Sequence, residues 1–236
     1  MSFVDPTNSA LFGKEAEGWW DTQGPFRILH QMNPVRFSFV EKEMTRNFGK
    51  SPFDGRKVLD IGTGGGLMAE ACAEKGALVT ALDADARNIE VARAHAATQG
   101  LTINYLVGDL DVLDGSAPFD LVMALEVVEH VASPGAFVAA CASHVAPGGL
   151  LVMSTLNRTA ASYLLGIIAA EYVLGWAPKG AHSWGQFVKP SELARAVREA
   201  GLCLTALRGI SYHPLASGWS LGHDTRMNYI LAAKRL

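Results

Sequence analysis

The sequence predicts an α/β protein with a doubly wound, mostly parallel sheet of seven strands in a Rossmann-like arrangement. Two observations lead to this fold class. Short runs of β-branched and apolar residues alternate with helical segments between residues 57 and 154, and alternation at this spacing is typical of parallel β-α-β units. The first run, residues 57–61, leads directly into a glycine-rich turn and then a helix, which is how α/β folds bring backbone N–H groups to a nucleotide.

The strands expected in this sheet are short and rich in apolar and β-branched residues. They span residues 57–61, 78–82, 104–107, 119–125, 150–154, 202–210 and 228–234, the last expected to be antiparallel. Helices are expected over residues 67–75, 87–98, 133–147 and 190–200. Gly100 and Gly201 end two of these helices, because glycine readily adopts the left-handed conformation found there.

We expect a single domain over residues 1–236, because no repeat or low-complexity linker divides the chain. Four parts follow in order: a helical cap (1–50), the core (56–154), an apolar insertion (155–188) and a C-terminal helix with strands (189–236). In the cap, Pro34 is expected in the first turn of a helix, where its missing N–H would have no partner anyway. Trp19 and Trp20 fit two interpretations: core residues, or a lid over the glycine turn, with Arg36 reaching the ligand's carboxylate.

The composition limits the kinds of function. The chain has 236 residues, 49% of them hydrophobic, and a formal net charge of −3, so it can bury a sizeable core and offers no basic field for nucleic acid. Cys72, Cys141 and Cys203 lie far apart in apolar stretches, and we expect reduced core thiols of a cytosolic protein. The N-terminal residues do not resemble a signal peptide, and no run reaches the roughly 18 to 20 apolar residues that span a bilayer.

The glycine turn helps to choose between classes of nucleotide ligand. When the dinucleotide fingerprint G-x-G-x-x-G is aligned to begin at Gly62, its sixth position is not a glycine. When it is aligned to begin at Gly64, its sixth position is Ala69, which matches only the variant that allows alanine there. Asp60 stands two residues before the first glycine, where its charge would repel a pyrophosphate. A carboxylate there suits a ligand with a positive end, such as the amino group and sulfonium of S-adenosylmethionine. We therefore expect S-adenosylmethionine, with a nicotinamide dinucleotide and a ligand-free structural turn as alternatives.

Further acids follow the second and third strands. Asp83 comes about 20 residues beyond the glycines, where a carboxylate can accept hydrogen bonds from both ribose hydroxyls. Asp85 is a competitor for this role, but Asp83 follows the strand more directly. Asp109 lies at the end of the third strand, where a contact with the adenine edge is expected.

Glu126, Glu129 and His130 directly follow the fourth strand and border the same pocket. If this segment turns helical at once, the three side chains lie at i, i+3 and i+4 on one helix face. Two carboxylates and an imidazole can bind a hard or borderline cation, or they can position a base that ionises a substrate hydroxyl. A third interpretation is that they only order the loop. We expect His130 near the substrate, with the metal and the base as open alternatives.

Over residues 56–154, the chain resembles the class I S-adenosylmethionine-dependent methyltransferases in Asp60-x-Gly62-x-Gly64, Asp83, Gly108-Asp109 and Pro147-Gly148-Gly149. A narrower resemblance, to the ubiquinone-biosynthesis O-methyltransferases, extends over residues 19–229. The segments that carry it are Trp19-Trp20-Asp21, His30-x-x-Asn33-Pro34-x-Arg36, Ser154-Thr155-Leu156-Asn157-Arg158, Glu171-Tyr172, Pro178-Lys179-Gly180 and Phe187-x-Lys189-Pro190. Thr63 departs from the family pattern, in which cysteine is frequent at this position.

The narrower resemblance implies an S-adenosylmethionine-dependent enzyme that methylates catechol-type hydroxyls on a polyprenylated ring, with demethylated ubiquinol and polyprenyl dihydroxybenzoate or hydroxyphenol as substrates. It implies cofactor contacts for Arg36, Gly62, Asp83 and Leu125, to which the residues themselves add Gly64 and Asp109. It also associates Glu126, Glu129 and His130 with a magnesium-type ion. Other enzymes of ubiquinone biosynthesis are candidate partners.

An apolar stretch follows the fifth strand. Residues 163–176 carry one charge in fourteen positions, a run too short to span a bilayer and too apolar for an ordinary exposed loop. Arg158 and Lys179 flank it. One interpretation is that residues 160–176 dock the protein on the inner face of the membrane, where a polyprenylated substrate resides; the other is a helix pair packed over the pocket. The first interpretation predicts a cytoplasmic protein bound peripherally to the membrane.

Three other functions are compatible with the sequence: methylation of N, C or O on another small soluble metabolite, a nicotinamide-dependent dehydrogenase, and a non-catalytic S-adenosylmethionine-binding subunit of a quinone-synthesis complex. Titration with S-adenosylhomocysteine against NAD separates the dehydrogenase from the others. Turnover of a short-chain catechol separates an enzyme from a binding subunit.

Overall fold

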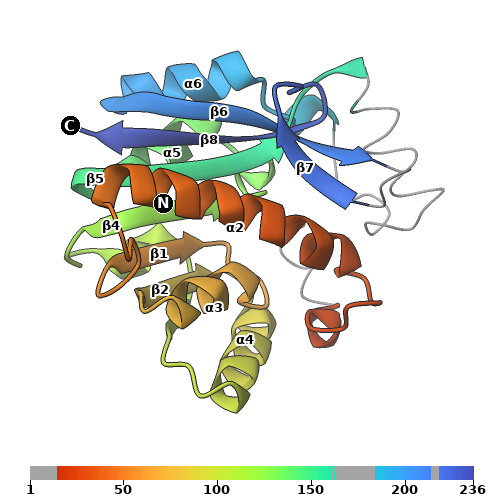
Figure 1. Cartoon of the computed structure of the whole chain (residues 1–236), viewed down its shortest axis with the longest axis vertical. Helices are drawn as coiled ribbons and strands as arrows, with labels where there is room; N and C mark the ends of the chain where they lie inside the picture. The colour runs from red at the N-terminus through yellow and green to blue at the C-terminus, as the bar shows by residue number, and fades with distance from the viewer. Residues whose placement is uncertain (1–14, 161, 163–183, 214–217) are drawn as a thin grey trace.

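The computed structural model describes residues 15–160, 162, 184–213 and 218–236. Within these residues, eight strands form one sheet in the order β3-β2-β1-β4-β5-β8-β6-β7 (Figure 1). The parallel part comprises β1 (Lys57–Ile61), β2 (Leu78–Asp83), β3 (Asn104–Val107), β4 (Phe119–Leu125) and β5 (Val145–Leu156). The antiparallel part comprises β8 (Asn228–Arg235), β6 (Leu202–His213) and β7 (Gly218–Gly222). The predicted fold class is confirmed.

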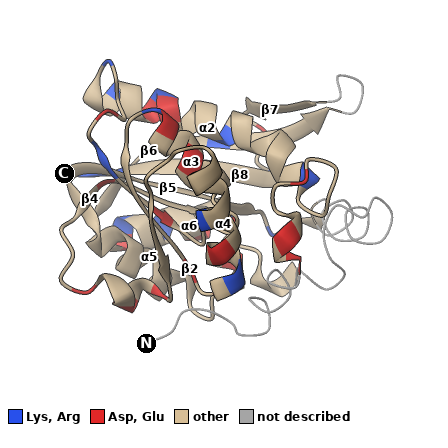
Figure 2. Ribbon diagram, turned by 90° about the horizontal axis from the view of Figure 1, so that it is seen from below, with Lys and Arg blue, Asp and Glu red and all other residues tan. Residues whose placement is uncertain are grey.

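Helices cover both faces of the sheet. On one face lie α2 (Arg27–Phe48), α3 (Leu67–Glu74) and α4 (Ala86–Thr98), and on the other α5 (Pro134–Ser143) and α6 (Pro190–Glu199). In the described ranges, short 3₁₀ helices join these elements: η1 (Ala16–Gly18), η2 (Leu110–Leu113), η3 (Val128–His130) and η5 (Trp184–Gln186). Figure 2 shows acidic and basic residues interspersed along the ribbon rather than gathered by sign.

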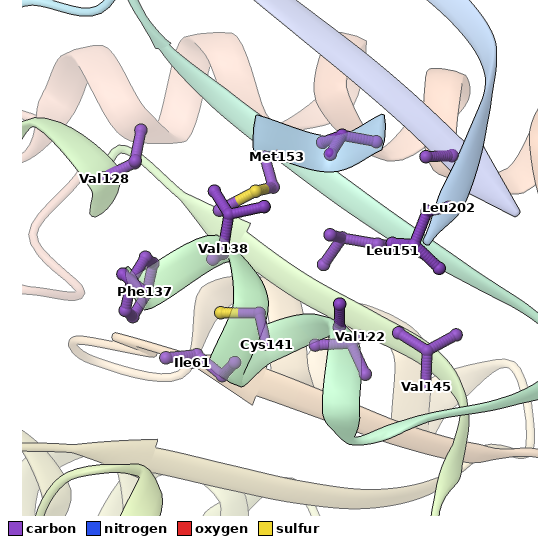
Figure 3. Close-up of a cluster of buried hydrophobic side chains, with 14 of the residues drawn as sticks. Ile61, Val122, Val128, Phe137, Val138, Cys141, Val145, Leu151, Met153 and Leu202 are labelled. Atoms are coloured by element: carbon purple, nitrogen blue, oxygen red, sulfur yellow. The ribbon is translucent and has the colours of Figure 1, made fainter. Parts of the chain in front are cut away.

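The central strands are buried from both sides, which explains their continuous apolar runs. Every residue of β1 after Lys57 is buried. On the face covered by α5, Phe137, Val138 and Cys141 belong to the same core cluster as Ile61 and strand residues of β4 and β5 (Figure 3). This two-sided packing holds the carboxyl ends of β1, β2 and β4 in fixed positions, and the candidate site lies at those ends.

Two predicted helix boundaries are wrong. α2 begins at Arg27, so Pro34 lies inside the helix instead of in its first turn. Apolar burial along α2, at Phe39 and Val40 among others, outweighs the hydrogen bond that an interior proline removes. The helix predicted to continue to residue 147 ends at Ser143, because β5 already begins at Val145 and pairs with Phe119 before an irregularity in the ladder.

The sheet contains one strand more than the seven predicted. β7 is a short edge strand with glycine at both ends, and such strands give a weak sequence signal because they bury little apolar surface. The expectation of three core thiols is wrong for Cys203, which is exposed, whereas Cys72 and Cys141 are buried. Cys203 directly follows the buried Leu202 in β6, and successive strand residues point to opposite faces.

Among the described residues, no helix is both long and apolar enough to cross a membrane. The membrane-docking segment predicted at residues 160–176 lies outside the described residues apart from positions 160 and 162. The division of the chain into a cap, a core, an insertion and a C-terminal part stays a prediction.

Candidate active site

The glycine loop, residues 62–66, links the end of β1 to the start of α3. Gly62, Gly64 and Gly66 have φ angles of 68°, 54° and 89°, a region that other residues rarely adopt. A Cβ atom at Gly62 would lie 2.6 Å from Cγ2 of Val127. The loop is therefore packed against the segment after β4, and the predicted strand-turn-helix unit is confirmed.

Asp60 lies beneath this loop in β1 and is buried. The Thr63 hydroxyl donates a hydrogen bond to Asp60 Oδ2 over 2.7 Å, so the residue that departs from the family pattern acts here as a donor. Burial raises the pKa of Asp60 from 3.8 to about 7, the Thr63 hydrogen bond opposes this rise, and the nearby Asp83 adds to it. A cation bound beside Asp60 would favour its ionised form.

Asp83 ends β2 and is turned toward the glycine loop. Its Oδ2 accepts a hydrogen bond from Gly64 N–H (2.9 Å), and its Oδ1 accepts from Asp85 N–H (2.9 Å) and Asn88 Nδ2 (3.1 Å). Burial raises the pKa of Asp83, and these donors oppose the rise. We name Asp60, the glycine loop and Asp83 the cofactor side of the site.

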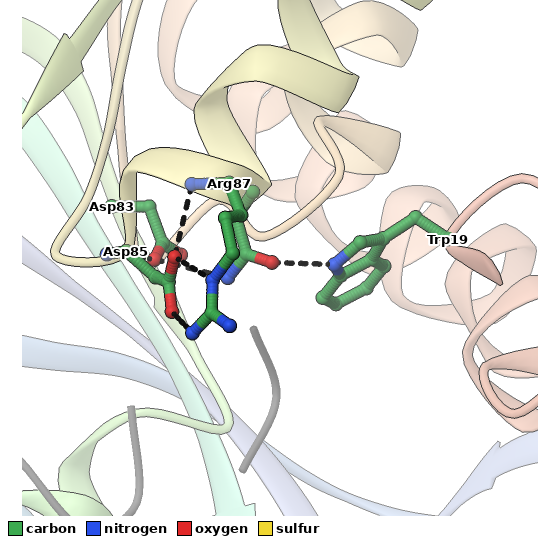
Figure 4. Close-up of polar contacts among 5 residues, drawn as sticks. Trp19, Asp83, Asp85 and Arg87 are labelled. Atoms are coloured by element: carbon green, nitrogen blue, oxygen red, sulfur yellow. Dashed lines mark hydrogen bonds and ion pairs between the residues drawn. The ribbon is translucent and has the colours of Figure 1, made fainter. Parts of the chain in front are cut away.

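The competitor, Asp85, has a different role. It caps the N-terminus of α4 by accepting hydrogen bonds from the backbone N–H and the side chain of Arg87 (Figure 4). These bonds lower the pKa of Asp85. Because both carboxylate oxygens of Asp85 bind Arg87, Asp83 is the acid available to the glycine loop.

The two cap tryptophans lie directly on the glycine loop. Trp19 donates from Nε1 to Asn88 Oδ1 over 2.9 Å (Figure 4). A Cβ atom at Gly64 or Gly65 would lie 2.4 Å from the Trp19 ring system. Trp20 donates from Nε1 to the Gly65 carbonyl (2.9 Å) and stacks on His95 with ring centroids 3.3 Å apart. Trp19 also belongs to a small core cluster, so the core position and the place over the loop, offered as alternatives by the sequence, coincide.

Asp109 lies at the N-terminus of η2, directly after the end of β3. Its Oδ1 accepts a hydrogen bond from Leu110 N–H (2.7 Å). The preceding Gly108 donates its N–H to the Asp83 carbonyl (2.9 Å). The ends of β2 and β3 are thereby tied together, and Asp109 lies at the same edge of the sheet as Asp83.

Arg36 lies on α2 and is 2% exposed. Its Nη2 lies 2.8 Å from Glu126 Oε1, and its Nη1 donates to Asn33 Oδ1 (3.1 Å). Burial lowers the pKa of Arg36, while Glu126 and Glu129 oppose the change. In this structure, which contains no ligand, the arginine predicted to bind a carboxylate of the ligand binds a carboxylate of the protein.

The prediction that Glu126, Glu129 and His130 share one helix face required a helix that begins at Glu126. Glu126 instead has a φ of 57°, and η3 starts two residues later. Three side chains hold it there: Arg36, Ser154, whose hydroxyl donates to Oε1 (2.7 Å), and Asn228, whose Nδ2 donates to Oε1 and Oε2 (3.1 and 3.2 Å). Leu125, the preceding residue, ends β4 and pairs with Ser154. Contacts from distant elements thus sustain a backbone conformation that is unfavourable for glutamate.

Glu129 and His130 lie on η3. Glu129 is 2% exposed, and neither carboxylate oxygen has a hydrogen-bond partner in the described structure. Burial and the Glu126 charge raise the pKa of Glu129 well above its ordinary value, while the Thr155 hydroxyl and Arg36 oppose the rise. His130 is half-buried at the end of η3. We name Arg36, Glu126, Glu129, His130, Thr155 and Asn228 the acceptor side.

The magnesium site predicted at Glu126, Glu129 and His130 stays a prediction. In the part of the chain that the structure describes, no three His, Cys, Asp or Glu side chains are arranged to hold a metal ion. The left-handed turn at Glu126 directs this carboxylate to Arg36 and Asn228, and its charge still raises the pKa of Glu129.

Comparison with known proteins decides the family. A family model described as a methyltransferase domain matches residues 28–207. Two relatives named ubiquinone biosynthesis O-methyltransferase, from Methylocella silvestris and Maricaulis maris, are each 45% identical to the chain; they align over 99% and 98% of it and over 96% and 93% of their own length. The chain belongs to the ubiquinone biosynthesis O-methyltransferases. The resemblance predicted from the sequence motifs is confirmed.

The fold of this ubiquinone biosynthesis O-methyltransferase also has counterparts of low sequence identity. It is similar to the magnesium protoporphyrin IX methyltransferase ChlM from Synechocystis, solved with bound SAH, with a TM-score of 0.66 and 19% identity over 98% of both chains. A second structure of ChlM, with bound SAM, gives a TM-score of 0.63 at 16% identity. These likenesses show that the chain has the class I methyltransferase fold.

Sequence reasoning missed three side chains of the site in this ubiquinone biosynthesis O-methyltransferase: Asn88, Thr155 and Asn228. Each is a polar residue that is buried. Thr155 and Asn228 lie in largely apolar strands, and that contrast is the signal that could have found these two, whereas Asn88 lies in a helix with several charged residues and gives no such signal. The partners themselves lie far away in the sequence: Asn228 binds Glu126 across 102 positions.

Proposed function

We propose that this protein transfers the methyl group of S-adenosylmethionine to a catechol-type hydroxyl on a polyprenylated ring in ubiquinone biosynthesis. The observation that carries the proposal is the near full-length similarity to relatives of that name, at 45% identity. The geometry agrees with it, because a glycine loop with the acids Asp60 and Asp83 and a second, polar cluster lie at the carboxyl ends of neighbouring strands. In open α/β sheets, ligands bind at these ends.

On the cofactor side, each residue has a defined task. Asp60 would attract the positively charged end of S-adenosylmethionine, and the glycine loop would allow close approach of the ligand. Asp83 would exchange its present donors for the ribose hydroxyls, with Asp109 at the adenine edge. Leu125 ends β4 beside the loop and would contact the cofactor. When bound, S-adenosylmethionine supplies a methyl group on an already activated sulfonium.

On the acceptor side, the protein must align the hydroxyl and remove its proton. The phenolic O–H bond breaks, and its proton passes to the imidazole of His130. The oxygen then forms a bond to the methyl carbon, while the carbon–sulfur bond breaks and leaves its electron pair on sulfur. The carboxylate of Glu126, on the same segment, would favour an imidazolium. These steps use side chains of the protein alone, and a magnesium-type ion held by Glu126, Glu129 and His130 is the alternative that the EDTA experiment below tests.

We also propose that the protein works at the membrane surface, since a polyprenylated substrate resides in the bilayer. The support is the sequence of residues 160–176, with one charge in its last fourteen positions. Of the two flanking cations, Arg158 contacts Glu192 and the Gly185 carbonyl, so its charge is already paired in part. We therefore expect reversible binding driven mainly by apolar contact.

The membrane proposal is tested by co-sedimentation with liposomes. Leu164→Glu combined with Ile168→Glu should abolish liposome binding and leave turnover of a water-soluble catechol unchanged. Liposome binding that persists in a variant with lost cofactor affinity would instead identify the segment as part of the core.

The enzymatic proposal is tested by turnover of a demethylated quinol and a prenylated dihydroxybenzoate, each with and without EDTA. We expect methylation of both rings and binding of S-adenosylhomocysteine but not of NAD. Loss of all activity in EDTA, with recovery on adding magnesium, would overturn the metal-free mechanism. Cofactor binding without turnover of any catechol would point to the binding-subunit alternative.

A further inference from the structure

The peptide unit between Gly65 and Gly66 is held at both ends in the glycine loop. The Gly65 carbonyl accepts a hydrogen bond from Nε1 of Trp20 over 2.9 Å, and the Gly66 N–H donates to the Thr63 carbonyl over 3.0 Å. Residues 64–66 are three consecutive glycines, and glycine has more conformational freedom to lose than any other residue type. The contact from Trp20, which lies outside the loop, therefore restricts a segment that is otherwise free to change shape.

Trp20 is held in turn by His95 of α4. The two rings are stacked, with centroids 3.3 Å apart and an interplanar angle of 8°. His30 of α2 faces the indole edge-on, with ring centroids 6.0 Å apart, and Trp20 also packs against the core cluster that contains Trp19. Neighbours on a face and an edge of the indole limit the directions in which its N–H can point.

The His95 ring is oriented by Glu70 of α3. Its Nδ1 lies 3.0 and 2.9 Å from the two carboxylate oxygens of Glu70. Because an ionised carboxylate only accepts hydrogen bonds, Nδ1 carries a proton and donates it. Glu70 is 3% exposed; burial raises its pKa, and the hydrogen bond and charge of His95 oppose the rise. The pair therefore fixes the plane of the imidazole on which Trp20 lies.

These contacts form a closed set around the start of α3. The backbone N–H of Glu70 donates to the Gly66 carbonyl over 2.9 Å. The contacts thus lead from Gly65 through Trp20 and His95 to Glu70, and from Glu70 back to the loop at Gly66. His95 is thereby linked to the glycine loop from two directions, through the cap and through α3.

The orientation of this peptide matters for a ligand. Gly66 is the N-cap of α3, and no side chain caps the helix there. The first N–H groups of a helix are available to a ligand when nothing in the protein caps them. Their direction depends on the residues that precede the helix, and Trp20 fixes one of the peptide units in that segment.

We propose that Trp20 and His95 are positioning residues for the cofactor: Trp20 holds the glycine loop in its binding conformation, and His95, oriented by Glu70, holds Trp20. This inference rests on the proposed function, because S-adenosylmethionine is the ligand that the loop would receive. A loop that is already ordered loses less conformational entropy when a ligand binds, so the affinity is higher.

The first test removes the indole N–H and keeps an aromatic ring. Trp20→Phe should weaken binding of S-adenosylhomocysteine, measured by calorimetry at one pH, about 3- to 10-fold, the effect of one net hydrogen bond. KM for S-adenosylmethionine should rise by a similar factor, whereas KM for a short-chain catechol should stay as in the wild-type chain. Trp184→Phe is the matched control, because Trp184 donates the same kind of bond, from Nε1 to the Thr159 carbonyl over 2.9 Å, outside the cofactor side. This control should bind S-adenosylhomocysteine like the wild-type chain.

The second test separates affinity from stability at His95. His95→Ala and His95→Phe both remove the donor to the buried Glu70, so both should lower the melting temperature. Only His95→Phe keeps a ring on which Trp20 can stack. His95→Ala should therefore weaken S-adenosylhomocysteine binding about 2- to 10-fold, the effect of one aromatic pair, whereas His95→Phe should retain most of the affinity. Trp20→Phe combined with His95→Ala should weaken binding by less than the product of the single effects, since both act on one contact.

Two results would overturn the inference. Unchanged affinity for S-adenosylhomocysteine in folded Trp20→Phe would mean that the loop keeps its shape without the indole N–H. Equal losses of affinity in His95→Ala and His95→Phe, in step with the fall in melting temperature, would assign these residues a structural role only. Failure of the proposed function looks different, because the wild-type chain itself would then bind no S-adenosylhomocysteine or would methylate no catechol.

Discussion

Asp83 on the cofactor side accepts hydrogen bonds from Gly64, Asp85 and Asn88, whereas Glu129 on the acceptor side accepts none that the described structure provides. Glu129 is buried and Asp83 is partly buried, and burial is the largest cause of the raised pKa of each. The two sides therefore differ most in their partners. Asp83 has three donors without any ligand, and Glu129 has none among the described residues.

This difference has consequences for binding. A ligand on the cofactor side replaces existing hydrogen bonds of Asp83 and meets Trp19 on the glycine loop, so much of its interaction free energy offsets bonds that are lost. A ligand on the acceptor side adds hydrogen bonds to atoms that have none, and each such bond contributes to affinity without an exchange. We expect substitutions on the two sides to affect different measurements.

The largest effect is expected from His130→Ala. Loss of a positioned base typically lowers the rate about 10²- to 10⁴-fold, and kcat should fall within this range. The affinity for S-adenosylhomocysteine, measured by calorimetry, should remain as in the wild-type chain because His130 belongs to the other side. A variant that loses cofactor affinity together with kcat would show that the two sides are not separable.

Asp83→Ala should have the opposite pattern and weaken cofactor binding. Charge-assisted hydrogen bonds to the ribose contribute about 1.5 to 3 kcal/mol, which corresponds to roughly 10- to 150-fold in Kd. Asp85→Ala is the control, because it removes a helix cap worth about 0.5 to 2 kcal/mol of stability but no ribose contact. Equal losses of affinity in the two variants would contradict the assignment of Asp83.

The contact between Trp19 and the glycine loop is tested by Gly64→Ala against Gly100→Ala. Both glycines have positive φ angles, 54° and 69°, but a Cβ atom meets Trp19 at 2.4 Å in the first case and nothing within 4 Å in the second. Both variants should lose about 1 to 2 kcal/mol from the left-handed backbone, and Gly64→Ala should lose about 1 to 3 kcal/mol more from overpacking. Urea unfolding measures the difference; equal losses would mean that the indole does not rest on the loop.

Asp60 gives the smallest effect, a dependence of cofactor affinity on pH. Its pKa is raised from 3.8 to about 7 in the ligand-free protein, and a cationic ligand favours the ionised form, so binding below pH 7 must release a proton. Affinity for S-adenosylmethionine should rise with pH by up to about tenfold per unit below the pKa and level off above it. Asp60→Asn should bind more weakly and lose this dependence. If the affinity of Asp60→Asn for S-adenosylmethionine depended on pH as it does in the wild-type chain, the role of Asp60 would be contradicted.

The same ionisation bears on stability. A carboxyl whose pKa is higher in the folded chain than in the unfolded chain destabilises the fold as pH rises between the two values. The ligand-free protein should therefore lose stability from pH 3.8 to about 7 through Asp60, and Asp60→Asn should remove that contribution. Thermal melts of both proteins across this range measure it.

The cofactor side could be predicted from the sequence because its parts are contiguous. Strand, glycine turn and helix follow one another over residues 57–74, and Asp83 ends the next strand, so local rules place them together. The acceptor side could not be predicted in the same way. Glu126 takes its conformation from Arg36, Ser154 and Asn228, which come from α2, β5 and β8, and no local pattern encodes such contacts.

The interior Pro34 and the edge strand β7 were missed for a related reason. In both places, packing against other elements outweighs local propensity: α2 tolerates a proline because its buried face holds it on the sheet, and β7 pairs with β6 despite its glycines. Propensity predicts an element only where the rest of the fold does not compete with it.

The account is tested most directly by incubating the purified chain with S-adenosylmethionine carrying an isotopically labelled methyl group and a prenylated dihydroxybenzoate, followed by mass spectrometry of the ring. The predicted result is one labelled methyl group on a ring oxygen with the wild-type chain, and labelling at least about 10²-fold slower with a His130→Ala variant that still binds S-adenosylhomocysteine. A label on carbon, or full transfer by His130→Ala, would contradict it.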